Sequence, residues 1–214
     1  MMKKVLIINA SARTLESKSR ELSSVFADHW KITHQKPEIS YRELGNVHIS
    51  HISESWIAAN LKPTAHRSEV ENNILAESTA YITELKAADV IVMSTPMYNW
   101  SIPSPLKAYI DQIFRVNETF SVNPANPENP YVGLLKNRTL FLLLSRGGEG
   151  YEPGEANAHL NFQSTYLKTV FNIMGIHNIH TVAIDGTSFD KEKLKHTIAT
   201  AHQKVRDLVE AELI

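Results

Sequence analysis

Five short apolar runs, each followed by a helical pattern, constrain the fold of this 214-residue chain more than any other feature. Most of the runs are continuously apolar rather than alternating, which is typical of parallel strands that are covered on both faces. After the runs, apolar residues recur at the spacing of a helix face, as in Leu22, Val25, Phe26 and Trp30. The five expected strands are Lys3–Ile8, Ile39–Glu43, Asp89–Ser94, Thr139–Ser145 and Ile179–Ile184.

This regular alternation predicts an α/β fold with right-handed crossovers between parallel strands. Five strands suit a doubly wound, flavodoxin-like sheet in the order 2-1-3-4-5, with helices on both faces. The chain length suits one such domain over residues 1–214, without an internal repeat or a linker. In this class of fold, ligands bind at the carboxyl ends of the strands, so we expect a site in the loops that follow them.

Charge and cysteine content exclude several classes of protein. The formal net charge is −1 and the basic residues are dispersed, which argues against nucleic acid or an anionic membrane as a partner. The lack of cysteine excludes disulfides and thiol chemistry, and it fits a cytoplasmic location. The first apolar run follows Lys3-Lys4 and resembles a signal peptide, but it is shorter than the roughly 7–15 apolar residues that such a segment needs. A buried first strand explains it better.

Two long segments interrupt the alternation, namely Gly45–Arg67, which contains Trp56, and Thr119–Lys136, which contains three prolines. Segments of this length without a regular pattern are usually functional or form interfaces. The simpler interpretation is a surface excursion that is packed by its own side chains. An exposed tryptophan in the first segment would instead favour a contact between subunits.

The loop after the third strand carries the strongest local signal for a ligand. Tyr98 and Trp100 stand on either side of Asn99, so a flat, partly apolar ligand can lie on the aromatics while the amide binds its polar edge. The loop leads into a helix, for which we expect Ser104 as the N-cap and Pro105 as the first helical residue.

The loop after the first strand is rich in hydroxyl groups and contains no glycine, unlike a dinucleotide-binding turn or a P-loop. A helix that begins near Lys18 would present unpaired amides and a positive dipole end to this loop. Ser11, Ser17 and Ser19 add hydroxyl groups and Lys18 adds a charge, which together predict a monophosphate site. The alternative is that these serines only cap the helix.

The loop after the fourth strand, Ser145-Arg146-Gly147-Gly148, lies in the most glycine-rich part of the chain. Glycine permits positive φ and a close approach of the backbone, so this loop can place amides against the carbonyl oxygens of a ring. The alternative is a flexible surface loop. In the order 2-1-3-4-5 the first, third and fourth strands are adjacent, so the three loops should meet and form a pocket of the shape that FMN needs.

The motif Pro96–Ser104 resembles the signature of the FMN-dependent NADH-azoreductases, also described as FMN-dependent NADH:quinone oxidoreductases. The Ser145–Gly148 motif matches the second element of that family, and the serine loop aligns as well, so the resemblance covers essentially the whole chain. It implies that non-covalent FMN passes two electrons, as hydride, from NADH to quinones, and that aromatic azo compounds are cleaved to amines. It also implies a homodimer with a flavin site at each end of the interface.

The resemblance carries the family's roles over to this chain by position. Ser11, Ser17, Lys18 and Ser19 would hold the phosphate and the ribityl chain. Pro96, Met97, Tyr98, Asn99 and Trp100 would line the isoalloxazine, and Ser145, Arg146, Gly147 and Gly148 would close its other edge. No side chain is assigned as a nucleophile, whereas Asn99 and Gly147 are candidates for tuning the flavin. Trp100 and Lys18 stand where Phe and Gln are common in the family, and we expect Trp100 to alter the preference for electron acceptors.

The sequence also allows other functions to be considered. The pairs His48 with His51 and His177 with His180 fall in loop or strand-like sequence, where a spacing of three does not converge on one face, so we expect no metal site. The main alternative function is a non-enzymatic, flavodoxin-like electron carrier, although such carriers are typically shorter and strongly acidic. A nucleotide-binding regulatory module that has lost its cofactor is a third.

Overall fold

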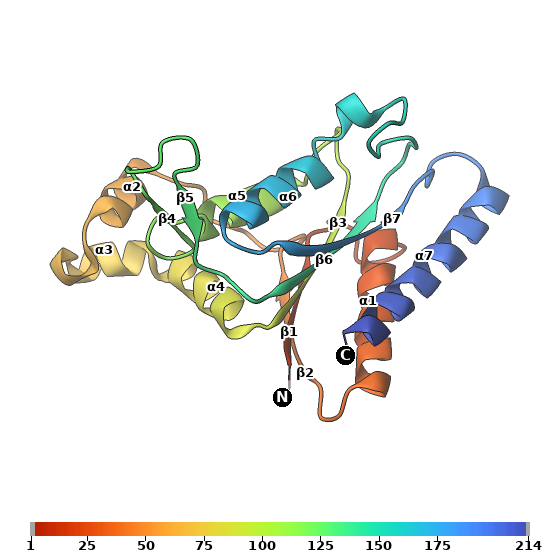
Figure 1. The fold of residues 1–214 in the computed structure, drawn as a ribbon, viewed down its shortest axis with the longest axis horizontal. Helices are drawn as coiled ribbons and strands as arrows, with labels where there is room; N and C mark the ends of the chain where they lie inside the picture. The colour runs from red at the N-terminus through yellow and green to blue at the C-terminus, as the bar shows by residue number, and fades with distance from the viewer. Residues whose placement is uncertain (1–2, 213–214) are drawn as a thin grey trace.

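The computed structural model describes residues 3–212 and has a parallel five-stranded sheet at its centre (Figure 1). Its strands are β1 (Lys4–Asn9), β2 (Glu38–Glu43), β3 (Val90–Pro96), β6 (Thr139–Ser145) and β7 (Asn178–Ile184). Their order is β2-β1-β3-β6-β7, and every neighbouring pair is parallel. The predicted order 2-1-3-4-5 is therefore confirmed. β3 runs further than expected because Pro96 stays in register with Ser145 of β6.

Helices cover both faces of the sheet. α1 (Lys18–Thr33) and α7 (Lys191–Ala211) lie on one face, whereas α4 (Ala76–Ala87), α5 (Ser104–Ile113) and α6 (Ser164–Ile173) lie on the other (Figure 1). Successive strand residues point to opposite faces, so a continuously apolar strand contributes to two cores. Val5 and Ile7 pack in the core under α1 and α7, while Leu6 and Ile8 pack in the core under α4, α5 and α6.

The two irregular segments have structure of their own. The first contains α2 (Glu54–Leu61) and a 3₁₀ turn (Thr64–His66), and α3 (Glu69–Ile74) follows it. Trp56 is buried, and its Nε1 donates a hydrogen bond to Gln112 Oε1 at 2.9 Å, so the exposed tryptophan that would have favoured a subunit contact is not present. Trp56 packs in a small cluster with Ala59 of the same helix and with Leu75, which fits the interpretation of a surface excursion with its own packing, and the hydrogen bond to Gln112 ties it to α5.

The second segment forms an antiparallel pair of short strands, β4 (Phe120–Val122) and β5 (Tyr131–Gly133). A 3₁₀ turn (Ala158–Leu160) precedes α6, and Gly175 follows that helix with a φ of +98°. Over residues 3–212, no helix combines the length and the apolar character that crossing a membrane takes.

Candidate functional site

A pocket of about 580 Å³ opens at the carboxyl ends of the central strands. This volume lies within the usual range for sites that bind small molecules. The three loops that were expected to meet do meet here, at the point where the strand order reverses between β1 and β3. The predicted residues that line the pocket are Ser11, Ser17, Lys18, Pro96, Met97, Tyr98, Ser145 and Gly147.

The N-terminus of α1 supplies the part of the pocket that suits an anion. The helix begins at Lys18, and the hydroxyl of its N-cap, Ser17, accepts a hydrogen bond from the Arg20 amide. Amides of a first helical turn lack intrahelical acceptors and carry the positive end of the helix dipole. Ser17 thus caps the helix and lines the pocket at once. Ser19 is fully buried behind it, with 3.3 Å between the two hydroxyl oxygens, and does not line the pocket.

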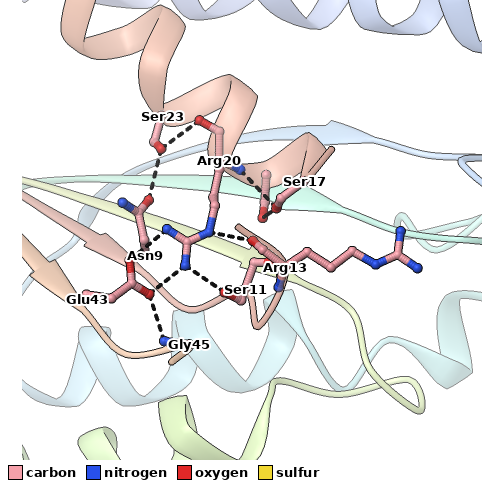
Figure 2. Close-up of polar contacts among 9 residues, drawn as sticks. Asn9, Ser11, Arg13, Ser17, Arg20, Ser23, Glu43 and Gly45 are labelled. Atoms are coloured by element: carbon pink, nitrogen blue, oxygen red, sulfur yellow. Dashed lines mark hydrogen bonds and ion pairs between the residues drawn. The ribbon is translucent and has the colours of Figure 1, made fainter. Parts of the chain in front are cut away.

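Arg20 holds this loop from behind, an arrangement that the sequence did not predict. Its Nε donates to the carbonyl oxygen of Arg13 at 2.8 Å and its Nη2 to that of Ser11 at 2.7 Å (Figure 2). The same guanidinium pairs with both carboxylate oxygens of Glu43, at 2.6 and 2.5 Å, and Glu43 accepts a further bond from the Gly45 amide. We call these contacts of Arg20, Glu43 and Gly45 the Arg20 clamp. Burial raises the pKa of Glu43, but the bonds from Arg20 and Gly45 outweigh it and bring the pKa below its ordinary value.

The loop after β3 is a tight turn. The backbones of Tyr98 and Ser101 are hydrogen-bonded in both directions, and the residues between them, Asn99 and Trp100, have φ values of +47° and +64°. Two successive positive φ values are typical of two-residue hairpin turns. Tyr98 lines the pocket, whereas Asn99 and Trp100 lie at the tip of the turn outside its lining. Of the two aromatic residues of this motif, Tyr98 lines the pocket and Trp100 does not.

The helix that follows this turn begins one residue earlier than expected. α5 starts at Ser104, Pro103 occupies the cap position, and no side chain caps the helix. Pro105 still lies in the first turn, where its missing N–H interrupts no intrahelical bond. The predicted serine cap was therefore wrong, although the predicted helix is present.

The glycines of the loop after β6 are required by close side-chain neighbours and not by the positive φ that was expected. Neither Gly147 nor Gly148 has a positive φ, which in this region belongs to Gly150 and Gly154. A Cβ on Gly148 would instead lie 2.6 Å from the Tyr151 hydroxyl, and one on Gly147 would lie 2.9 Å from the Ser188 hydroxyl. Because these two residues have no side chains, the loop leaves room for Tyr151 and Ser188. Gly147 lines the pocket.

Arg146 supports this loop from inside rather than lining the pocket. Its side chain is buried, and it donates hydrogen bonds to Gln163 Oε1 at 3.1 Å and to Glu152 Oε1 at 2.8 Å. Asp185 lies 3.7 Å from the same guanidinium. Burial raises the pKa of Asp185 to about 6, although Arg146 opposes the shift.

Five lining residues were not predicted, namely Arg13, Glu16, Thr187, Ser188 and Leu194. The loop after β7 reaches the site because its amides at Thr187 and Ser188 donate to the carbonyl oxygens of Arg146 and Gly147. Its sequence signal was a small-residue turn directly after the fifth strand. That strand lies at the edge of the sheet, which made its loop a weak candidate.

The chemistry of the lining fits FMN. A helix N-terminus with two serine hydroxyls can hold a phosphate, and the apolar edge of Pro96, Met97 and Tyr98 can lie against a flat ring. Ser145, which accepts a hydrogen bond from the Met97 amide, and Gly147 continue the lining beside this edge. Within residues 3–212, no three His, Cys, Asp or Glu side chains converge in a way that would hold a metal ion.

Comparison with known proteins gives matches along nearly the whole chain. The family model described as having a flavodoxin-like fold matches residues 3–209. FMN-dependent NADH:quinone oxidoreductase 1 of Trichormus variabilis is 36% identical over 206 residues, which cover 96% of this chain and 95% of that protein. The enzyme of the same name from Pseudomonas fluorescens is 34% identical over 211 residues, which cover 98% of this chain and all of that protein.

Solved structures agree with these matches. The FMN complex of an FMN-dependent NADH-azoreductase from Bacillus anthracis str. Ames Ancestor superimposes with a TM-score of 0.85 at 25% identity, covering 98% of this chain and 99% of that one. An azoreductase from Bacillus anthracis str. Sterne has the same fold, with a TM-score of 0.88 at 24% identity over 98% of this chain and all of that one. The chain therefore belongs to the flavodoxin-like family of FMN-dependent NADH:quinone oxidoreductases and NADH-azoreductases.

Proposed function

We propose that this protein is an FMN-dependent enzyme that passes two electrons, as hydride, from NADH to quinones and reductively cleaves aromatic azo compounds to amines. The observation that carries the proposal is the pocket itself, which joins a helix N-terminus suited to a phosphate to an edge of Pro96, Met97 and Tyr98 on which a flat ring can lie. Its full-length relatives bear the name FMN-dependent NADH:quinone oxidoreductase, and a solved structure of the same fold bears that of an FMN-dependent NADH-azoreductase.

The residues of the pocket have distinct tasks in this proposal. FMN, when bound, supplies the hydride chemistry, and the protein binds, orients and tunes it. Ser11, Ser17 and the first amides of α1 bind the phosphate, with Lys18 close by. The Lys18 ammonium is shared with Glu21 at 2.8 Å, so the amides and hydroxyls carry most of this interaction.

The ring is held by the other two loops. Pro96, Met97 and Tyr98 of the loop after β3 line it together with Ser145 and Gly147 at the end of β6. In this proposal, backbone amides of the Asn99 turn and of Gly147-Gly148 stabilise negative charge on the ring. Ser19, Trp100 and Arg146 support the pocket from outside its lining.

A steady-state assay tests the enzymatic claim. Purified protein reconstituted with FMN should oxidise NADH when benzoquinone is supplied, and it should bleach an aromatic azo dye with release of amines. Protein that retains FMN but does not oxidise NADH would instead support the electron carrier. Colourless protein that cannot be reconstituted would support the regulatory module.

The proposal includes a cytoplasmic homodimer. Exposed apolar side chains on α2 and on the β4–β5 pair support a contact between subunits, among them Ile57, Leu61, Val122 and Tyr131. These elements lie at the same end of the molecule (Figure 1). Light scattering coupled to gel filtration should give twice the 24.1 kDa of the chain. A mass of one chain at micromolar concentration would contradict the homodimer.

A further inference from the structure

One side chain organises the backbone of the serine loop. Arg20 donates to two carbonyl oxygens, those of Ser11 and Arg13, and the rest of its guanidinium is engaged by Glu43 (Figure 2). An arginine fork holds several acceptors in one plane, which a lysine ammonium cannot do. The loop between β1 and α1 contains no glycine, and Glu16 has a φ of +55°, so its conformation needs outside support.

Arg20 acts on this loop from the side away from the pocket. It does not line the pocket, but it lines a separate hollow of about 310 Å³ together with Asn9, Ser23 and Tyr41. The Arg13 side chain, in contrast, lines the pocket and extends away from the clamp (Figure 2). Any effect of Arg20 on a ligand must therefore pass through the loop.

The geometry of the peptide bond shows how this effect is transmitted. In a trans peptide the carbonyl and the following N–H point in opposite directions. Turning the Ser11 and Arg13 carbonyls toward Arg20 therefore turns the amides of Ala12 and Thr14 away from it. Gly45 backs the same loop closely, since a Cβ at that position would lie 1.9 Å from the Ser11 carbonyl oxygen.

We propose that Arg20, held by Glu43, is a positioning residue that sets the Ser11–Ser17 loop for the FMN phosphate without touching the cofactor. This inference rests on the proposed function. Glu43 neutralises the guanidinium at contact distance, so Arg20 acts through the position of the loop and not through its charge. The proposal distinguishes the phosphate from the ring, because the ring is held by the loops after β3 and β6.

The experiment compares FMN with riboflavin, which has the same ring but no phosphate. Binding of both to apoprotein is followed by flavin fluorescence for wild type, Arg20→Gln and Arg20→Lys. Both variants should lower the affinity for FMN about tenfold or more, which corresponds to the loss of one hydrogen bond to a charged group. Riboflavin affinity should change by less than about threefold, since the ring contacts stay intact.

Arg42→Gln is the matched control. Arg42 is the neighbour of Glu43 in β2, and it forms the same kind of pair with Glu84 of α4, with Nε 3.0 Å from Oε2. It has no contact with the serine loop, so its loss should leave the ratio of FMN to riboflavin affinity unchanged. Hydrogen exchange of apoprotein adds a readout that needs no flavin. Amides of residues 11–16 should exchange faster in Arg20→Gln than in Arg42→Gln.

The outcomes separate this inference from the proposed function. Arg20→Gln with an unchanged ratio of FMN to riboflavin affinity would overturn the positioning role, as would equal loss of both ligands. Arg20→Lys that binds FMN like wild type would show that charge suffices, which also overturns it. Wild-type protein that binds no FMN would overturn the proposed function, and hydrogen exchange of the loop would still decide whether Arg20 holds it.

Discussion

Asn99 and Trp100 adopt left-handed backbone conformations in succession, which is unusual for residues with side chains and costly for a bulky aromatic. Asn tolerates this conformation better than most residues, because its short polar side chain can bond locally. Both residues lie outside the pocket lining, whereas their neighbour Tyr98 lines the pocket, so we expect the turn to act on the site chiefly by positioning Tyr98.

Substitutions at Asn99 test this interpretation. Asn99→Ala should weaken flavin retention and slow turnover, because a left-handed alanine costs about 1–2 kcal/mol. Asn99→Gly, which adopts positive φ freely, should retain both within about twofold. Equilibrium dialysis of FMN and NADH–quinone kinetics measure the two effects. Loss of FMN in Asn99→Gly would show that the side-chain amide itself contacts the flavin.

Asp185 gives a pH-dependent prediction. Burial raises its pKa to about 6 against the pull of Arg146, so the folded state favours the neutral acid. The contribution of Asp185 to stability is therefore most favourable at pH values below the ordinary pKa of Asp, is lost as the pH rises through about 6, and stays lost above that. Asp185→Asn should raise the free energy of unfolding at pH 8 by on the order of 2–3 kcal/mol and leave it unchanged near pH 4.

Chemical denaturation at the two pH values measures the difference. The exposed Asp28, on α1, is a suitable control, and Asp28→Asn should show no such dependence on pH. Equal stabilisation by Asp185→Asn at pH 4 and pH 8 would show that its effect comes from packing rather than from ionisation.

At the scale of elements, the β4–β5 pair packs closely against the end of α6, where the backbones of two glycines meet. A Cβ on Gly133 would lie 2.2 Å from the Gly175 Cα, and the Leu135 amide donates to the Met174 carbonyl at 2.8 Å. Backbones this close leave no room for a side chain. Gly133→Ala should therefore lower the free energy of unfolding by more than about 2 kcal/mol, because whole elements must shift.

Gly154→Ala is the comparison for that variant. Gly154 has a φ of +90°, but a Cβ at that position would meet no other atom within 4 Å, so only backbone strain opposes the change. We expect a loss of about 1–2 kcal/mol. Urea denaturation ranks the two variants, and a cost for Gly133→Ala no larger than for Gly154→Ala would contradict the close approach.

At the scale of the whole molecule, the pocket joins loops from β1, β3, β6 and β7, so a ligand should stabilise the entire fold. FMN at 100 times its Kd should add about 2.7 kcal/mol. For a chain of this size, that raises the melting temperature by about 5–11 °C. Differential scanning fluorimetry or calorimetry with FMN and riboflavin measures the shift, which should be smaller for riboflavin. An unchanged melting temperature with FMN would contradict the site.

The sequence by itself determined the layered fold, because the apolar content of strands and helix faces is a local pattern that any packing must bury. It also placed the serine, aromatic and glycine loops at one edge, since parallel strands share their carboxyl ends. The family motifs at Pro96–Ser104 and Ser145–Gly148 narrowed the choice of ligand to FMN.

Only the tertiary structure decided which side chains face the pocket. Contacts between residues distant along the chain leave no periodic signal, so neither the hold of Arg20 on the Ser11 carbonyl nor the approach of Ser188 to Gly147 was visible. The place of Trp100 outside the lining goes with two left-handed backbone conformations, and the burial of Trp56 depends on where α2 packs. These features are set by packing in three dimensions, which local propensity does not encode.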